Sequence, residues 1–377
     1  MIRLAPAVGA MVLVLVGAAL AAAPETIRVA VVESARVVEL RGVDIEVSEL
    51  GGCPGCSGAA PRRVASVRAT VAGTAVEIDG ARAGGFRLVS DRPIRLNGRE
   101  YTAALDVVRN GDGLAVVNEL PLDDYVVGVL RAEASERWPL EALRAQAIVA
   151  RTYAAYHRTI AGGKPYHLVA STVHQQYAGW VPAASPLWTA VRDTTGQVLL
   201  WEGDVFPAFY HTESGGYTED PRSVFAARNM PALRPVRCEF SAGSPHFYWA
   251  LDVRLADLAE ILKRNDVAVG SVRAIEVTER TPSLRAAVVT VHGSRGSARL
   301  RGSDFRRMLG YDTFKSTLFA VAVDGQAAHF SGRGYGHGVG MCQWGAKGMA
   351  EQGYTARQIL EFYYPGTVLG ALDALAR

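Results

Sequence analysis

The sequence predicts an α+β protein with an N-terminal β-rich region, a central amphipathic helix that carries the site, and a mixed α/β C-terminal part. Three observations predict it: short apolar alternations before Glu119, one long helical stripe after Pro139, and mixed helix and strand patterns after Leu251. A chain of 377 residues is long enough for two or three domains. We expect a β-rich region over residues 24–118 and the domain that carries the site over residues 119–370.

The first 23 residues have the features of a secretory signal. A basic start, Met1-Ile2-Arg3, precedes an apolar run that ends in the small residues Ala21-Ala22-Ala23. We predict a signal peptide over residues 1–23, cleaved after Ala21, and export to the periplasm or cell envelope. The alternative is an uncleaved N-terminal membrane anchor.

Alternating residues predict strands in the β-rich region. The predicted strands are Ile27–Val32, Val67–Val71, Thr74–Ile78 and Leu105–Val108. The dipeptides Asp79-Gly80, Asn97-Gly98 and Asn110-Gly111 are typical of hairpin turns, because Asn, Asp and Gly tolerate positive φ.

The strongest helix signal lies in the middle of the chain. It begins at Pro139, which suits a first helical turn, and ends at Gly162-Gly163. One apolar stripe recurs at helical spacing along it: Leu140, Leu143, Ala147, Ala150 and Ala154.

Helix and strand patterns alternate after Leu251. We predict helices over Val253–Lys263, Gly302–Leu309 and Ala356–Tyr363, and strands over Val272–Glu279, Ala286–His292 and Leu318–Val323.

Charge and cysteine content narrow the classes of partner. The net charge of +3 comes without a dense basic block, so we expect no nucleic-acid partner. Cys53 and Cys56 lie in a Gly/Pro-rich loop and are predicted to form a local disulfide. Cys238 and Cys342 are further disulfide candidates, because an exported protein meets oxidising conditions.

Three segments combine glycine with polar or aromatic side chains. They are His211–Thr218, Gly332–Ala346 and His174–Gly179. Dense glycine is typical of positive φ or of close backbone approach to a ligand. Amides, hydroxyls and aromatic rings along a groove suit a sugar, which offers hydroxyl groups and an apolar ring face.

Glu133 is the candidate catalytic residue. It lies between an apolar run and the long helix, and a carboxyl group against apolar walls has a raised pKa and can donate a proton near neutral pH. The alternative is a solvated carboxylate or one paired with Arg131 or Arg144. Asp123 and Asp124 are predicted to be turn and capping residues, and Glu136 and Glu141 solvated acids.

Several motifs resemble one family. The matching segments are Pro121–Val129, Glu141–Ala147, Ala150–Tyr153, Gln176–Gly179, Ser214–Gly216, Ser244–His246, Gly336–Met341, Gln343–Ala346 and Tyr363–Thr367. With these motifs the chain resembles the stage II sporulation protein D and amidase enhancer family over most of its length after Glu119.

The resemblance implies a lytic transglycosylase that acts on peptidoglycan glycan strands, with a preference for strands stripped of stem peptides, no cofactor, and Glu133 as a single acid/base. Most glycosidases need two carboxylates, whereas the C6 hydroxyl of the muramoyl residue is the nucleophile here. The candidate substrate-binding residues are Arg144, Gln146, Arg151, Tyr153, Gln176, Tyr177, His211, Ser214, Gly215, Gly216, His337, Gln343 and Trp344. For Gln146, Arg151 and His337 a buried structural role stays equally open.

The sequence departs from the family at three places. Ala134-Ser135 replaces a common Met-Pro, and Arg144 replaces a frequent Lys. The zinc-binding cysteines of some members would fall near Ala170 and Gln175, so we predict no metal.

Two other function classes stay open. One is a non-catalytic cell-wall-binding module that stimulates an N-acetylmuramoyl-L-alanine amidase, which makes such an amidase a possible partner. A metal-dependent hydrolase using His167, His174 and His211 is weaker, because these histidines lack a known metal-binding spacing.

Overall fold

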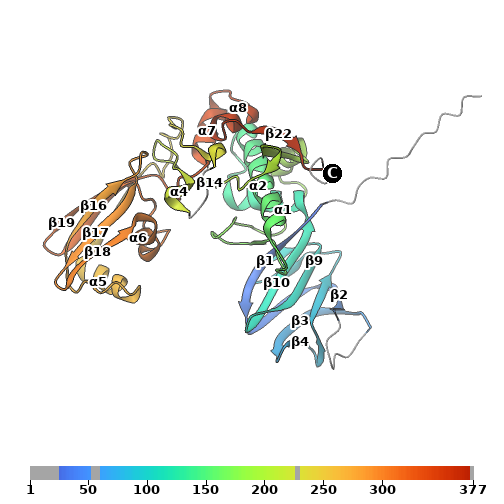
Figure 1. The fold of residues 1–377 in the computed structure, drawn as a ribbon. Helices are drawn as coiled ribbons and strands as arrows, with labels where there is room; N and C mark the ends of the chain where they lie inside the picture. Colours follow the sequence, from blue (N-terminus) through green and yellow to red (C-terminus); the bar gives the residue numbers. More distant parts are fainter. Residues whose placement is uncertain (1–24, 52–59, 226–229, 374–377) are drawn as a thin grey trace, which may run out of the picture.

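The computed structural model describes residues 25–51, 60–225 and 230–373. The predicted α+β class is confirmed. The predicted signal peptide and the Cys53/Cys56 pair lie outside the described residues. Figure 1 shows three parts: a β-rich part in blue and cyan, a central group of helices, and beside them a lobe formed by residues 248–333, which we call the orange lobe.

The β-rich part is one large sheet. Its spatial order is β11-β1-β10-β9-β6-β2-β3-β4-β5, and the short β7–β8 hairpin joins it through β2. Within the described residues its strands are β1 (Thr26–Ala35), β2 (Val37–Leu50), β3 (Arg62–Ala72), β4 (Ala75–Ile78), β5 (Ala81–Ala83), β6 (Gly85–Val89), β7 (Ile94–Leu96), β8 (Arg99–Tyr101), β9 (Ala104–Asn110), β10 (Gly113–Pro121) and β11 (Leu168–Val169). All four predicted strands are present.

The predicted turn dipeptides connect neighbouring antiparallel strands. Asp79-Gly80 joins β4 to β5, and Asn97-Gly98 joins β7 to β8. Asp79 and Asn97 each have φ of 50°, the left-handed conformation that a two-residue hairpin needs. At the third dipeptide the turn is shifted by one residue: Asn110 ends β9 and pairs with Gly113, so Gly111 and Asp112 form the loop to β10.

Strand β10 leads directly into α1 (Leu122–Glu133), a helix that the sequence patterns showed only as an apolar run. Pro121 is its N-cap residue, and Asp123 and Asp124 lie in the first turn, where negative charge favours the helix dipole. Tyr125, Val126 and Val129 are buried against the rest of the fold. The helix ends at Glu133, which places the candidate acid at its C-terminus.

The predicted long helix is α2 (Leu140–Ile160). Pro139 is its N-cap residue, one position before the helix, rather than a residue of the first turn. The predicted stripe is buried together with the large sheet and α1 in one hydrophobic core. The opposite face of α2 packs on α7 (Gln343–Glu351) and α8 (Ala356–Tyr363) in a second core.

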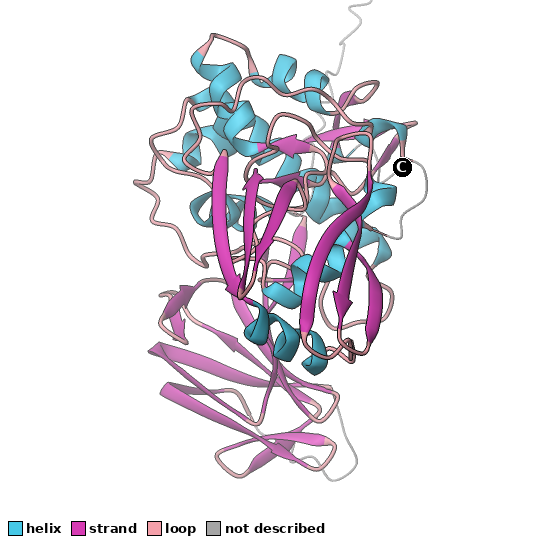
Figure 2. Ribbon diagram, turned by 90° about the vertical axis from the view of Figure 1, so that its left-hand side faces the viewer, coloured by secondary structure: helices cyan, strands magenta, loops and turns pink. Residues whose placement is uncertain are grey.

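The orange lobe has a third core of its own. In Figure 2 its two small sheets stand in front of the helices. The sheets have the orders β15-β20-β19 and β16-β17-β18. Their elements are β15 (Tyr248–Arg254), α5 (Leu255–Arg264), β16 (Val272–Arg280), β17 (Ala286–Gly293), β18 (Gly296–Arg301), α6 (Gly302–Leu309), β19 (Phe319–Asp324) and β20 (Ala327–Arg333).

Most predictions for this lobe are confirmed, and one boundary is wrong. The helix predicted from Val253 begins at Leu255, because β15 runs through Arg254 in register with β20. Because the helix follows the strand without a loop, the residue pattern does not show where the strand ends and the helix begins.

Short elements complete the central part. They are α3 (Leu187–Asp193), β12 (Gln197–Trp201), β13 (Asp204–Val205), β14 (Tyr210–His211), α4 (Pro221–Val224), the 3-10 helix Pro231–Leu233, β21 (Met341–Cys342) and β22 (Val368–Ala371). No helix among the described residues is long and apolar enough to cross a membrane.

Candidate active site

Glu133 is held at the end of α1 by groups from three distant segments. The backbone N–H of Gln176 donates to its Oε1 at 2.9 Å. The side-chain amide of Gln343 donates to its Oε2 at 3.4 Å and to its backbone carbonyl at 3.5 Å. The hydroxyl of Tyr210 lies 3.5 Å from Oε1. Both carboxyl oxygens therefore have fixed donors.

A chain of hydrogen bonds supports Tyr210 from behind. The amide of Gln175 donates to the Tyr210 hydroxyl at 3.2 Å and to the carbonyl of Ala150 at 3.4 Å. The hydroxyl of Tyr125 in turn donates to the Gln175 side-chain oxygen at 3.0 Å. Because Gln175 and Tyr125 are buried, this chain fixes the Tyr210 hydroxyl relative to α1 and α2.

The surroundings of Glu133 raise its pKa. Burial is the largest cause, and the donors from Gln176, Gln343 and Tyr210 partly oppose it by stabilising the charged form. The position at the C-terminus of α1 acts in the same direction as burial, because the negative end of the helix dipole disfavours a carboxylate. The geometry therefore gives Glu133 the character of a proton donor.

Glu133 makes no ion pair within the described residues, contrary to the alternative of a paired carboxylate. Arg131 pairs instead with Glu136, with nitrogen and oxygen 3.2 Å apart. Arg144 pairs with Asp193 and Glu141. No second carboxylate contacts Glu133 in the part of the chain that the structure describes.

Two short parallel strands bring the glycine-containing segments to Glu133. Strand β14 pairs with β21, so Tyr210 lies beside Met341 and His211 beside Cys342. Gly340 precedes this pairing with φ of 71°, and a side chain there would begin 1.8 Å from the carbonyl oxygen of Phe209. Only glycine permits this approach, which places Gln343 within reach of Glu133.

Two tryptophans flank the same region. Trp138 follows Glu133 in the chain, and Trp344 follows Gln343. Their rings meet edge to face with centroids 5.6 Å apart, and the Lys347 ammonium lies 5.2 Å from the Trp344 ring. Both rings are only partly buried, so they offer aromatic surface beside the carboxyl group.

Arg151 is a structural residue rather than a groove donor. Its side chain has no exposed surface, and two of its nitrogens donate to one oxygen of Asp123 at 2.8 and 2.9 Å. Its remaining donor contacts the Gln197 carbonyl. Of the two roles left open for Arg151, its burial favours the structural one: Arg151 ties α1, α2 and β12 together, and Asp123 is its partner.

Arg144 and Gln146 also lie outside the contacts around Glu133. The Arg144 guanidinium is committed to acidic side chains on α2 and at the end of α3. Gln146 is 1% exposed, and neither of its polar side-chain atoms has a partner within the described residues. Arg144 is partly exposed in a surface ion pair, and its substrate role stays a prediction, whereas the burial of Gln146 favours the structural role left open for it.

Tyr153 and Tyr177, predicted to bind substrate, are core residues. Tyr153 packs on His157 and Phe209 with ring centroids 4.4 and 5.8 Å away. The Tyr177 hydroxyl donates to Asn118 at 2.9 Å. Its ring fills the space above Gly128, where any side chain would collide with it.

The His211–Thr218 segment lies behind the site rather than on its surface. His211 and Ser214 are buried, and Nδ1 of His211 lies 3.1 Å from the carbonyl oxygen of Val339. Gly215 is buried with its N–H on the Glu213 carboxylate, and the N–H of Gly216 donates to the Ser214 hydroxyl. Burial gives His211, Ser214 and Gly215 a supporting role in this structure, while Gly216 is partly exposed and its substrate contact stays a prediction.

His337 is partly buried against aromatic rings. Its Nδ1 accepts from the N–H of Val339 at 3.0 Å, and its ring lies against Phe225 and His211. Burial lowers the pKa of His337 to about 3, so the imidazole is neutral. His337 makes no hydrogen bond to Glu133 in this structure.

Cys238 and Cys342 are free buried thiols, not a disulfide. Each sulfur has its own partners: Cys342 accepts from the N–H groups of Ser214 and Gly345, and Cys238 lies 3.1 Å from the Tyr363 hydroxyl. The two thiols are neighbours around Gly345, and hydrogen bonding from Cys342 lowers the pKa of Cys238 to about 6. The predicted pair is therefore adjacent but reduced.

The histidines considered for a metal take separate hydrogen bonds. His167 accepts from the Arg28 N–H, and His174 accepts from the Val169 N–H. In the described ranges no three His, Cys, Asp or Glu side chains are placed to hold a metal ion. The prediction of no zinc at Ala170 and Gln175 stays a prediction.

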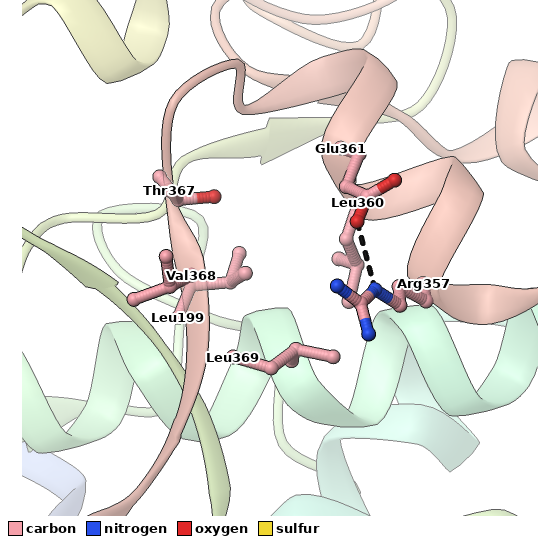
Figure 3. Close-up of a pocket in the computed structure, with 7 residues that line it drawn as sticks. All are labelled: Leu199, Arg357, Leu360, Glu361, Thr367, Val368 and Leu369. Atoms are coloured by element: carbon pink, nitrogen blue, oxygen red, sulfur yellow. Dashed lines mark hydrogen bonds and ion pairs between the residues drawn. The ribbon is translucent and has the colours of Figure 1, made fainter.

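A separate cavity of about 140 Å³ lies between α8 and β22 (Figure 3). Leu199, Leu360 and Leu369 line it, and Arg357 pairs with Glu361 at its side. It contains none of the predicted site residues, and the one carboxylate in its lining, Glu361, is paired with Arg357.

Sequence patterns missed Tyr210, Gln175 and Tyr125. Gln175 lies inside the His174–Gly179 segment but was not chosen as a site residue, and Tyr210 directly precedes the His211–Thr218 segment. For Tyr210 the neighbouring motif was the available signal. Tyr125 looked like one of many buried positions in an apolar run.

Two regions of the chain match models of known families. Residues 110–201, which include Glu133 and all of α2, match the family model described as stage II sporulation protein. Residues 235–340 match a domain of unknown function.

Curated relatives cover most of the chain. It is 34% identical over 274 residues to an uncharacterized protein of Brachyspira hyodysenteriae, covering 72% of each chain. It is 31% identical to the amidase enhancer of Bacillus subtilis, over 64% of this chain and 40% of that protein. It is 28% identical to stage II sporulation protein D of Bacillus amyloliquefaciens, over 68% of this chain and 76% of the relative. The chain belongs to the stage II sporulation protein D and amidase enhancer family.

Proposed function

We propose that this protein is a lytic transglycosylase that cleaves peptidoglycan glycan strands with Glu133 as its single acid/base. The observation that carries the proposal is the carboxyl group of Glu133, which has a raised pKa, fixed donors on both oxygens and no second carboxylate in contact within the described residues. A reaction with an internal nucleophile needs only one such group.

In the first step the protonated Glu133 donates to the glycosidic oxygen while the bond from that oxygen to muramoyl C1 breaks. In the second step the Glu133 carboxylate takes the proton of the muramoyl C6 hydroxyl, and the C6 oxygen bonds to C1. The products are a 1,6-anhydro-muramoyl end and a free hydroxyl on the leaving sugar. No water is consumed, and Glu133 returns to its protonated form.

The surrounding residues support both forms of Glu133. Burial favours the protonated acid before cleavage, and the donors from Gln176 and Gln343 stabilise the carboxylate that follows. The partly exposed rings of Trp138 and Trp344 can stack on an apolar sugar face next to the acid.

Export and a cell-wall partner complete the proposal. Peptidoglycan lies outside the cytoplasm, which agrees with the signal peptide expected over residues 1–23. A relative is named amidase enhancer, and this name favours a second candidate, a module that binds glycan and stimulates an amidase without cleaving it.

Digestion of purified glycan strands separates these functions. We expect 1,6-anhydro-muramoyl ends by mass spectrometry with the wild-type protein and none with Glu133→Gln. Reducing ends would mean a hydrolase instead. If no product forms on intact or stripped strands while amidase activity rises on addition of the protein, the binding module is the better description.

A further inference from the structure

The orange lobe has an open pocket of about 500 Å³ on the face of its β15-β20-β19 sheet. We call it the Arg333 pocket and define it by Tyr248, Arg280, Leu284, Leu318 and Arg333. It lies within the region that matches a domain of unknown function. None of the residues predicted from the sequence to bind substrate belongs to it.

The pocket exposes apolar groups that a folded protein normally covers. Tyr248 is 74% exposed and Leu284 is 51% exposed. Gly332 also lines the pocket, but its missing side chain opens no space there, because the buried Trp249 ring lies where a Cβ would be, 2.3 Å away. The exposed Tyr248 ring therefore supplies the flat apolar surface of the pocket, as aromatic side chains do in sites for small ligands.

The pocket also carries positive charge without a counter-ion. The Arg333 side chain has no hydrogen-bond or ion-pair partner within the described ranges. The two terminal nitrogens of Arg280 donate to the carbonyls of Leu284 and Phe319 at 2.7 and 3.0 Å, which fixes its guanidinium but does not neutralise it. A guanidinium that is free to donate two parallel hydrogen bonds matches a carboxylate.

Backbone pairing connects this pocket to Glu133. Tyr335, two positions after Arg333, exchanges backbone hydrogen bonds with Glu213. A Cβ on Gly215 would lie 3.1 Å from the Cβ of Arg333. Since Gly215 follows Tyr210 by five positions, the backbone of Arg333 lies within about 20 Å of the tyrosine that contacts Glu133. A bound glycan strand of a few sugars can span that distance.

We propose that the Arg333 pocket binds a muramoyl residue of the glycan strand through its free lactyl carboxylate, with Arg333 as the carboxylate donor and Tyr248 under the sugar ring. The proposal rests on the proposed function, because it names a second contact of the same strand. A stem peptide converts the lactyl carboxylate into an amide and removes its charge. The pocket thereby selects strands from which an amide-cleaving reaction has already removed the peptide.

Binding measurements in a Glu133→Gln background test this directly, because that variant holds strands without cleaving them. The three ligands are stripped strands, stripped strands whose carboxylates have been converted to methylamides, and peptide-bearing strands. We expect stripped strands to bind about 10- to 100-fold more tightly than methylamidated ones, the range of one charged hydrogen bond.

Substitutions then assign the effect to this pocket. Arg333→Gln should lose most of the preference for the free carboxylate, and Arg333→Lys should retain part of it. Tyr248→Ala, at an exposed position, should weaken the binding of stripped and methylamidated strands equally. Arg273→Gln is the matched control, because Arg273 is exposed on β16 outside the pocket.

Several outcomes would overturn the proposal. One is equal binding of stripped and methylamidated strands by the parent protein, a result that does not depend on any pocket variant folding. Another is unchanged binding of stripped strands by Arg333→Gln with unchanged thermal stability. If Arg333→Gln weakens the binding of peptide-bearing strands more than that of stripped strands, Arg333 contacts a carboxylate of the stem peptide instead.

Failure here is distinguishable from failure of the proposed function. The product assay on the protein with Glu133 intact reports the chemistry, and the binding assay reports the pocket. If anhydro ends form but binding shows no preference for the free carboxylate, only this inference is wrong. If binding depends on the carboxylate but no strand is cleaved, the pocket proposal stands and the proposed enzymatic activity is wrong.

Discussion

The backbone N–H of Gln176 donates a 2.9 Å hydrogen bond to Oε1 of Glu133, which lies 43 positions earlier in the chain. A backbone donor cannot rotate away as a side chain can, so it fixes the carboxyl group at the end of α1. Gln176 follows β11, which pairs with β1 of the large sheet. The orientation of the candidate acid therefore depends on the packing of the large sheet as much as on α1.

Glu133→Gln is expected to lower the rate of strand cleavage by a factor of about 10² to 10⁴, the usual contribution of a general acid. Glutamine keeps the shape of the side chain but cannot donate the required proton. The rate of cleavage is measured by counting anhydro-muramoyl ends by mass spectrometry. Glu136→Gln is the matched control, because Glu136 is exposed and pairs with Arg131. Equal rates for the two variants would remove Glu133 from the mechanism.

The pH dependence of cleavage should follow the raised pKa of Glu133. The free enzyme must be protonated at Glu133, so kcat/KM should fall as the pH rises through that pKa. The pH at which kcat/KM falls should lie above the usual pKa range of a glutamate side chain. A profile that is flat through the acid and neutral range would contradict the prediction.

The same shift predicts that Glu133→Gln stabilises the fold at high pH. The native carboxyl group holds its proton at pH values where the unfolded chain has lost it, so the stability of the wild type falls as the pH rises through this window. Glutamine removes that dependence. We expect a Tm higher by about 1–3 °C at about pH 8 and unchanged at about pH 4, measured by circular dichroism. A variant less stable than the wild type at high pH would argue against a raised pKa.

Tyr210→Phe should move the alkaline limb of the cleavage profile to higher pH. In the wild type the Tyr210 hydroxyl stabilises the charged form of Glu133, so removing this hydroxyl raises the pKa of Glu133 further. We also expect a decrease in kcat of about fivefold from the missing hydrogen bond. Tyr217→Phe on the exposed surface is the control. An unchanged limb would show that Tyr210 only fills space.

Arg151→Ala and Arg144→Ala should differ in stability. Removing Arg151 leaves Asp123 without its partner in a partly buried network and opens a cavity, which we expect to cost about 3–5 kcal/mol in the free energy of unfolding. Arg144 forms surface ion pairs, and its removal should cost less than about 1 kcal/mol. Urea denaturation measures both. A stable Arg151→Ala protein that no longer binds strands would restore the substrate role predicted for it.

The sequence determined the local elements and pointed to the candidate acid. The dipeptides Asp79-Gly80 and Asn97-Gly98 predict their turns because few residues adopt positive φ. The alanine-rich stripe predicts α2 because helical spacing over many residues has no other explanation. Glu133 was proposed because it lies between an apolar run and the long helix, and because the resemblance to the family implies an acid at this position.

Helix α1 and helix α7 were missed for physical reasons. The apolar run before Glu133 is buried on several sides, so it lacks the polar face that reveals a helix. Helix α7 begins directly after a glycine-rich segment whose positive φ values belong to the loop before it. Its N-cap is the Cys342 sulfur, which is not among the usual capping side chains.

Only the tertiary structure decided which motif residues contact Glu133. A motif shows that Arg151, Tyr177, Ser214 and Gln343 belong together, but not which of them faces a groove and which faces the core. Burial settles that difference, since Arg151 lies inside with Asp123 while Gln343 reaches the carboxyl group. The sequence by itself named the candidate acid and most of its neighbours in the chain. Long-range packing of the large sheet, α2 and the β14–β21 pair chose the donors that act on it, because residues far apart in sequence meet only in the folded chain.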